Sequence, residues 1–343
     1  MSTVVAKERA LHPRVTAISP WALAAGVLVS IAAAAAVAMA QAAWIGKPFP
    51  GFFVLPNRVV ASIGRADWAG TRDGALFQHV VLAVDDAKVE TSAEVYGRAA
   101  RAGGRPLAYT LRRGASTDVV TMPTQVFSLA DYVTVFGAYA ATGLLYLLLG
   151  LLAAAVLPQA VGRAVLVLGG VAGVYALSGA GIYAPGASLR LHALAEALFP
   201  AALLQVALVY PGRWKLPAEP WTAIGWFLSL AIAVPYQLLL DEPTSYSVLH
   251  GSAETYLGVA GLALAGRLVC ELSSAPRAAG PLLRGATAGA VLGLGIPAVI
   301  VGLSGVTGGR LPVNAITAAA FAFPLCFAWG LVRERFAGEL PDS

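Results

Sequence analysis

The stretch YVTVFGAYAATGLLYLLLGLLAAAV, residues 132 to 156, contains no charged residue and is long enough to cross about 30 Å of hydrocarbon as one helix. Seven further windows are similarly long and apolar. They lie near residues 20 to 43, 163 to 183, 190 to 210, 221 to 240, 248 to 270, 283 to 305 and 312 to 332. The sequence therefore predicts a polytopic α-helical membrane protein with about eight transmembrane helices, one before a long insert and seven after it.

The composition agrees with a membrane protein. Of the 343 residues, 58% are hydrophobic and only 12% are charged, whereas soluble domains carry about 25% charged residues. The net charge of +5 comes from Lys and Arg scattered among short loops. Because these residues form no basic run, we expect no nucleic-acid partner.

The short loops predict the orientation. Basic residues gather on one side of the predicted membrane, at Lys7, Arg9, Arg14, Arg163, Arg213, Lys215, Arg277, Arg284, Arg333 and Arg335. The opposite short loops hold Arg190, Arg310, Asp241 and Glu242. The positive-inside rule then places residues 1–19 and 336–343 in the cytoplasm and the insert at 44–130 outside it.

The first apolar window has two interpretations. Its end, Ala38-Met39-Ala40, fits the small-x-small pattern of a signal-peptide cleavage site. The window is longer than the apolar core of about 7 to 15 residues found in signal peptides. We therefore expect an uncleaved transmembrane anchor over residues 20–43.

The insert at residues 44–130 is the one part of the sequence that suits a water-soluble core. Its β-branched runs at residues 57–64, 79–86 and 105–114 predict strands, and the helix formers at 92–103 end on a glycine. The predicted order is strand, turn, strand, helix, strand, with the turn at Asp85-Asp86.

This insert resembles a bacterial PDZ domain. The matching positions are Ala69-Gly70, Gly74, Val80 to Val84, Asp85-Asp86, Val89 and Leu107 to Gly114. PDZ domains add a peptide strand to a sheet edge and bind its terminal carboxylate with loop amides. The resemblance implies that this loop is formed by Gly51, Phe52, Phe53 and Val54. Phe52 and Phe53 also suit a different role, sealing the domain against the membrane.

The membrane half resembles the N-terminal sensor regions of bacterial histidine kinases of the competence type. The similar segments are FSLADYVTVFGAYAATGLLYLLLG (127–150), EALFPAALLQVALVYPGRWKL (196–216) and FPLCFAWGLVRERF (323–336). Such sensors carry one span, an extracytoplasmic PDZ-like domain and further spans before a cytoplasmic catalytic part. The resemblance implies a location in the bacterial inner (plasma) membrane. Since the sequence after Arg335 is short, we expect the output to come from another chain.

Two pairs of ionisable residues fall within predicted spans, where each charge costs about 2.5 to 3.5 kcal/mol. His192 and Glu196 are four residues apart, as are His250 and Glu254, so each pair shares a helix face. If their two helices are neighbours, the pairs converge near the outer surface. Three interpretations stay open: a divalent transition-metal site, a polar pocket that senses pH or a ligand, and two separate His–Glu hydrogen bonds.

Catalytic motifs are incomplete. The sequence lacks His-Glu-x-x-His, and the Gly-x-Ser-Gly-like GLSG at residues 302–305 is followed by no histidine. We therefore expect neither enzymatic activity nor a cofactor.

The sequence predicts a signalling or sensor protein that relays an extracytoplasmic cue to a separate cytoplasmic kinase or cyclase. The alternative is a membrane adaptor that presents protein C-termini to a protease. We also expect the protein to contact membrane lipid and an extracytoplasmic peptide or protein C-terminus.

Overall fold

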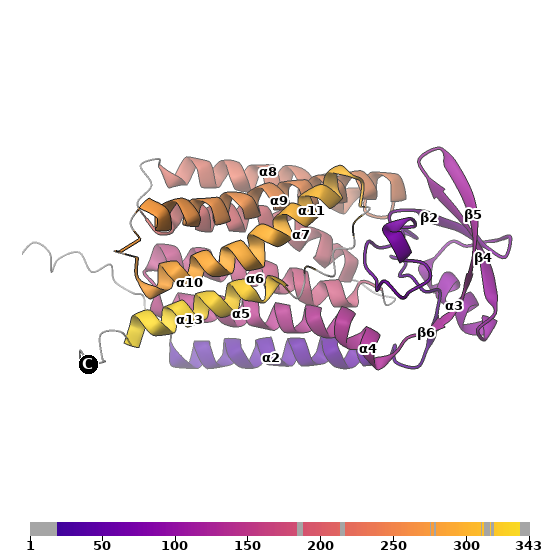
Figure 1. Cartoon of the computed structure of the whole chain (residues 1–343), viewed down its shortest axis with the longest axis horizontal. Coiled ribbons are helices and arrows are strands. Elements are labelled where there is room, and N and C mark those ends of the chain that lie inside the picture. Colours follow the sequence, from indigo (N-terminus) through magenta and orange to yellow (C-terminus); the bar gives the residue numbers. More distant parts are fainter. Residues whose placement is uncertain are drawn as a thin grey trace, which may run out of the picture.

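The computed structural model describes residues 19–183, 188–212, 217–274, 276–277, 279–309, 311, 316 and 319–336. Long helices run side by side in an elongated bundle, and a small sheet domain lies at one end of it (Figure 1). Helix α2 (Pro20–Ala42) forms one edge of the bundle. Helix α13 (Ala322–Phe336) ends far from the sheet domain. Nearly all of the tails predicted at 1–19 and 336–343 lie outside the described residues.

Seven helical segments among the described residues are long and apolar enough to cross a membrane. Five of them are single helices: α2, α6 (Gln159–Gly181), α7 (Ser188–Val209), α8 (Ala218–Leu238) and α9 (Pro243–Ser274). The segment Leu129–Val156 combines α4 (Leu129–Tyr132), a π-helical turn and α5 (Ala138–Val156). The segment Pro281–Val306 combines α10 (Pro281–Ala290), a second π-helical turn and α11 (Ile296–Val306). The prediction of a polytopic helical protein is confirmed at this level.

Two of the predicted spans differ from the structure in length. Helix α9 has 32 residues and begins five residues before the predicted window at 248–270. The eighth window, 312–332, lies partly outside the described residues. Most of its described part belongs to α13, which has 15 residues and packs against α10. The eighth span therefore stays a prediction.

Small residues bring the helices close together. A side-chain carbon added to Gly169 on α6 would lie 2.8 Å from the Cα of Gly150 on α5. The two backbones are therefore in direct contact, as is common where helices associate inside a membrane. Helix α7 packs against α6, α8 and α9 in turn, which places it at the centre of the helix contacts.

The sheet domain contains a four-stranded antiparallel sheet in the order β3-β2-β4-β5. Its strands are β2 (Val80–Val84), β3 (Ala87–Lys88), β4 (Pro106–Arg113) and β5 (Ser116–Pro123). Asp85 and Asp86 form the predicted turn between β2 and β3, with φ angles of 48° and 57°. Aspartate is among the residues that tolerate this left-handed backbone in tight hairpins. Helix α3 (Ser92–Ala102) begins at the cap residue Thr91 and ends at Gly103, close to its predicted bounds.

Two parts of the strand prediction were wrong. Residues 57–64 form no strand but only single bridges, Val54 to Val60 and Val59 to Val80. The backbone turns sharply at Arg58, whose φ is 68°, so it cannot run straight enough for a ladder. Strand β5 was not predicted, because most of its side chains are exposed and its sequence has no apolar face.

Candidate functional site

The four ionisable residues predicted to converge lie on neighbouring helices, α7 and α9, at the end of the bundle nearest the sheet domain. Nδ1 of His250 is 2.9 Å from Oε1 of Glu196, and its Nε2 is 3.5 Å from Oε1 of Glu254. Glu196 is fully buried and Glu254 is 3% exposed. One imidazole therefore lies between two buried carboxylates.

A tyrosine from a third helix completes this group. Tyr236 on α8 donates a hydrogen bond of 2.8 Å from its hydroxyl to Oε2 of Glu196. The ring of Tyr246 stacks on His250 with centroids 5.5 Å apart. We name Glu196, Tyr236, His250 and Glu254 the ionic cluster. Sequence reasoning missed Tyr236 because it lies near a helix end, where aromatic residues are common in membrane proteins.

His192 is not part of the ionic cluster. Its Nδ1 lies 3.0 Å from the carbonyl oxygen of Tyr175 on α6 and 3.4 Å from the hydroxyl of Ser178. Its ring stacks on that of Tyr175, with centroids 4.5 Å apart. Glu196 forms its ion pair with His250 of another helix rather than with His192 on its own helix.

The ionic cluster can hold a proton or a hydrogen-bonding ligand in a water-poor environment. Three ionisable groups within hydrogen-bond reach have strongly coupled charges, because the low dielectric of the interior weakens screening. The described residues contain no group of three or more His, Cys, Asp or Glu side chains arranged to hold a metal ion. The arrangement differs from two separate His–Glu hydrogen bonds, because His250 lies between carboxylates of two helices.

The loop implied by the PDZ resemblance is closed in the structure. Phe52, Phe53 and Val54 are fully buried. The hydroxyl of Tyr96 on α3 accepts a hydrogen bond of 2.7 Å from the Val54 amide and donates one of 3.0 Å to the Val54 carbonyl. Gly51 takes a φ of 80° and its carbonyl accepts from the Gly70 amide. A peptide strand reaches this edge only if Tyr96 moves away, and peptide binding stays a prediction.

Phe53 instead joins the sheet domain to the helices. Its ring stacks on Tyr183, just beyond α6, with centroids 4.4 Å apart, and packs edge-on against Trp44, just beyond α2. Phe136 lies 5.5 Å away in the segment leading into α5. Phe53 is therefore buried between the sheet domain and the helix ends rather than facing a membrane, whereas Phe52 packs inside the sheet domain against Tyr109.

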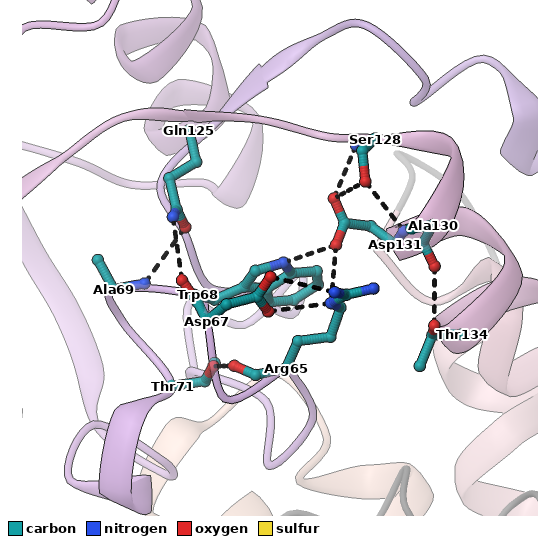
Figure 2. Close-up of polar contacts among 10 residues, drawn as sticks. All are labelled: Arg65, Asp67, Trp68, Ala69, Thr71, Gln125, Ser128, Ala130, Asp131 and Thr134. Carbon is teal, nitrogen blue, oxygen red and sulfur yellow. Dashed lines mark hydrogen bonds and ion pairs between the residues drawn. The ribbon is translucent and has the colours of Figure 1, made fainter.

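A buried carboxylate strengthens the same boundary at the start of α4 (Figure 2). Oδ1 of Asp131 accepts a hydrogen bond of 2.9 Å from the Trp68 indole and lies 3.2 Å from Nε of Arg65. Its Oδ2 accepts from the amide and the hydroxyl of Ser128, both at 2.7 Å, in a capping box. We name Arg65, Trp68, Ser128 and Asp131 the Asp131 junction.

Arg65 also binds a second, exposed carboxylate. Its guanidinium makes two hydrogen bonds to Asp67, of 3.0 and 3.1 Å. This contact with Arg65 lowers the pKa of Asp67 below its ordinary value. The arginine is therefore held between Asp67 on the surface and Asp131 at the boundary.

Polar contacts join the sheet domain to the ends of three further helices. Asn57 donates to the carbonyl of Leu240 just after α8, and Ser62 donates to the carbonyl of Gly309 just after α11. Ser247 on α9 donates to the side-chain carbonyl of Gln78 at 3.2 Å. The domain is thus fixed at several points, and no sequence motif indicated these contacts.

Comparisons with protein-family models, with curated proteins and with solved structures found no match to this chain. The resemblances to PDZ domains and to histidine-kinase sensor regions therefore stay predictions.

Proposed function

We propose that this chain is a non-catalytic signalling or sensor protein of the bacterial inner membrane. In this proposal its sheet domain is PDZ-like, lies outside the cytoplasm and receives a cue. The helix bundle passes the change to a separate cytoplasmic output protein, such as a kinase or a cyclase. The resemblance of the apolar segments to sensor regions supports the class of protein.

One structural observation carries the proposal: the sheet domain contacts two helices about one turn from the ionic cluster. Asn57 binds the carbonyl of Leu240, which lies one turn beyond Tyr236. Gln78 accepts a hydrogen bond from Ser247, which lies one turn before His250. A movement of the sheet domain therefore acts on the helix ends that position Tyr236 and His250.

This arrangement suits a relay because the two helices meet in a charged group. Relay requires two states of the bundle that bind the cue differently. A small shift of α8 relative to α9 changes whether Glu196 is shared by Tyr236 and His250, and short contacts between charged groups are sensitive to such shifts. The buried ionic cluster therefore favours a small number of discrete arrangements of these helices.

The direct test is in-cell crosslinking of the full chain with photoreactive residues at Arg333 and, separately, at Glu90 of the sheet domain. Glu90 is 65% exposed and pairs with Lys88. We expect Arg333 to crosslink to a kinase, a cyclase or another signalling regulator. Crosslinks confined to a protease and its clients at Glu90 would contradict the sensor proposal and support the adaptor alternative.

A further inference from the structure

The helix bundle contains a partly open cavity beside the ionic cluster. It has a volume of about 100 Å³ and lies among α5, α6, α7, α9 and the segment Pro281–Val306. Most of its wall is apolar, with Leu203, Leu257 and Val301 among the lining residues. Glu254 and Tyr146 also line it. The cavity therefore combines an apolar body with a few polar groups, which is typical of small-molecule sites.

Two polar atoms in this wall have unused hydrogen-bonding capacity. Oε2 of Glu254 and the hydroxyl oxygen of Tyr146 are buried without a hydrogen-bond partner, and the Ser304 hydroxyl, likewise unpartnered, lies near Glu254. The two residues are only 3% and 1% exposed. A buried polar atom without a partner is unfavourable, more so within a membrane where water is scarce. A bound molecule that donates hydrogen bonds would satisfy both oxygens.

The charges near Glu254 indicate what that molecule carries. His250 is the imidazole nearest to Glu254, yet it lies closer to Glu196, at 2.9 Å against 3.5 Å. His192 forms no ion pair among the described residues, and its Nδ1 lies against the Tyr175 carbonyl. Two buried carboxylates thus share one imidazole. A positively charged group beside Glu254 would compensate the second carboxylate.

We propose that this cavity binds a small, mainly apolar amine, with its ammonium group between Glu254 and the Tyr146 hydroxyl and its apolar part against Leu257 and Val301. An engineered cavity of about 150 Å³ accepts a benzene molecule, so this smaller cavity of about 100 Å³ limits the apolar part to about four carbon atoms. The inference deepens the proposed function by naming the class of ligand sensed. It predicts a site that neutral or anionic molecules of the same shape fill poorly.

The test is equilibrium dialysis of three probes of similar size, butylamine, butan-1-ol and butanoate, against the full chain in lipid nanodiscs, with empty nanodiscs as background. We expect saturable binding of butylamine and much weaker binding of the other two. Glu254→Gln keeps the shape of the side chain and should weaken butylamine binding at least about 10-fold, since it removes a charged hydrogen bond. Tyr146→Phe should weaken it about threefold.

Two further variants make the result decisive. Val301→Phe fills the cavity while leaving Glu254 in place and should abolish binding. Thermal unfolding should show that this variant remains folded. Tyr109→Phe removes a hydroxyl that is likewise buried without a partner, but in the sheet domain, and should leave binding unchanged.

Equal affinity for butylamine and butan-1-ol, equal affinity of Glu254→Gln and wild type, or no saturable binding would each overturn the inference. These measurements need no output partner. Failure of binding is therefore separate from failure of the relay, which the crosslinking tests.

Discussion

The indole of Trp68 in the sheet domain donates a 2.9 Å hydrogen bond to Asp131 at the first turn of α4, joining positions 63 residues apart in sequence. Asp131 is 5% exposed. Its carboxylate accepts hydrogen bonds from Trp68 and Ser128 and forms an ion pair with Arg65. A single buried side chain thus connects the sheet domain to the apolar helical segment Leu129–Val156 that follows it.

Replacing Asp131 should loosen this boundary. Asp131→Ala leaves the Trp68 indole, the Arg65 guanidinium and the Ser128 amide without their acceptor. We expect a loss of about 3 kcal/mol in the stability of the sheet domain, from charged hydrogen bonds and the helix cap. Hydrogen exchange of the β2 and β4 amides in nanodiscs measures this loss of stability.

Asp67→Ala is the matched control, because Asp67 binds the same arginine but its side chain is 64% exposed. The loss of stability in this variant should be below about 1 kcal/mol. Equal effects of the two variants would contradict this role of Asp131.

The ionic cluster predicts that Glu196 contributes more to the stability of the bundle than His192, although both lie on α7. Glu196→Ala leaves His250 and Tyr236 buried without their acceptor and should destabilise the bundle by about 3 to 5 kcal/mol. His192→Ala removes only the contacts with Tyr175 and Ser178 and should have the smaller effect. Thermal unfolding of both variants in nanodiscs decides the order. A larger effect of His192→Ala would mean that the pair within α7, rather than the pair across helices, holds the cluster.

Sequence periodicity and hydropathy predicted most of the fold, because a membrane-spanning helix satisfies its own backbone and needs only about 20 apolar residues in a row. The same reasoning located the turn at Asp85-Asp86 and helix α3. It failed for β5, whose exposed side chains give no pattern, and for residues 57–64, where one left-handed residue, Arg58, breaks the strand.

The candidate site could be predicted only in part. Spacing of four residues placed His250 and Glu254 on one face of α9, and this was correct. The partner of Glu196 depends on how α7, α8 and α9 pack, which spacing along one helix does not encode. The exposure of the cysteines depends on helix packing in the same way: Cys270 is exposed on α9, whereas Cys326 is half-buried.

Acid should weaken the sheet domain through His79. Burial lowers the pKa of His79 below its ordinary value of 6.5, so the folded domain holds it neutral. As the pH falls through 6.5 the unfolded chain takes up the proton first, and the folded state loses stability. Its charged neighbours are Arg113, which opposes protonation, and Asp118, which favours it. We expect the exchange protection of β2 to fall between pH 7 and pH 5 in wild type and to stay nearly level in His79→Gln. A slope of the same size in both would show that another group is responsible.

Tyr96 should keep the backbone edge at Val54 closed. Its hydroxyl is buried, which raises its pKa above the ordinary value and keeps the proton that it donates to Val54. Tyr96→Phe leaves the Val54 amide and carbonyl without partners and should cost about 1 to 3 kcal/mol. It should also increase binding of a peptide with a free apolar C-terminus, measured by fluorescence anisotropy against the same peptide with an amidated end. Strong carboxylate-dependent binding to wild type would show that the edge opens without this change.

Cys270 gives a reporter for movement passed through α9. It is exposed, and it lies on the same helix as Ser247 but at the opposite end. A fluorine label on Cys270, in a Cys326→Ala background, reports its surroundings by nuclear magnetic resonance. Gln78→Ala removes the sheet-domain contact at Ser247, and we expect it to shift the label signal or to split it into two.

Glu90→Ala is the control, since this exposed residue contacts Lys88 on the domain surface and its replacement should leave the signal unchanged. If Gln78→Ala and Glu90→Ala gave the same signal as wild type, the sheet domain would not act on α9 through Ser247, and the relay would have to run through the Asp131 junction instead.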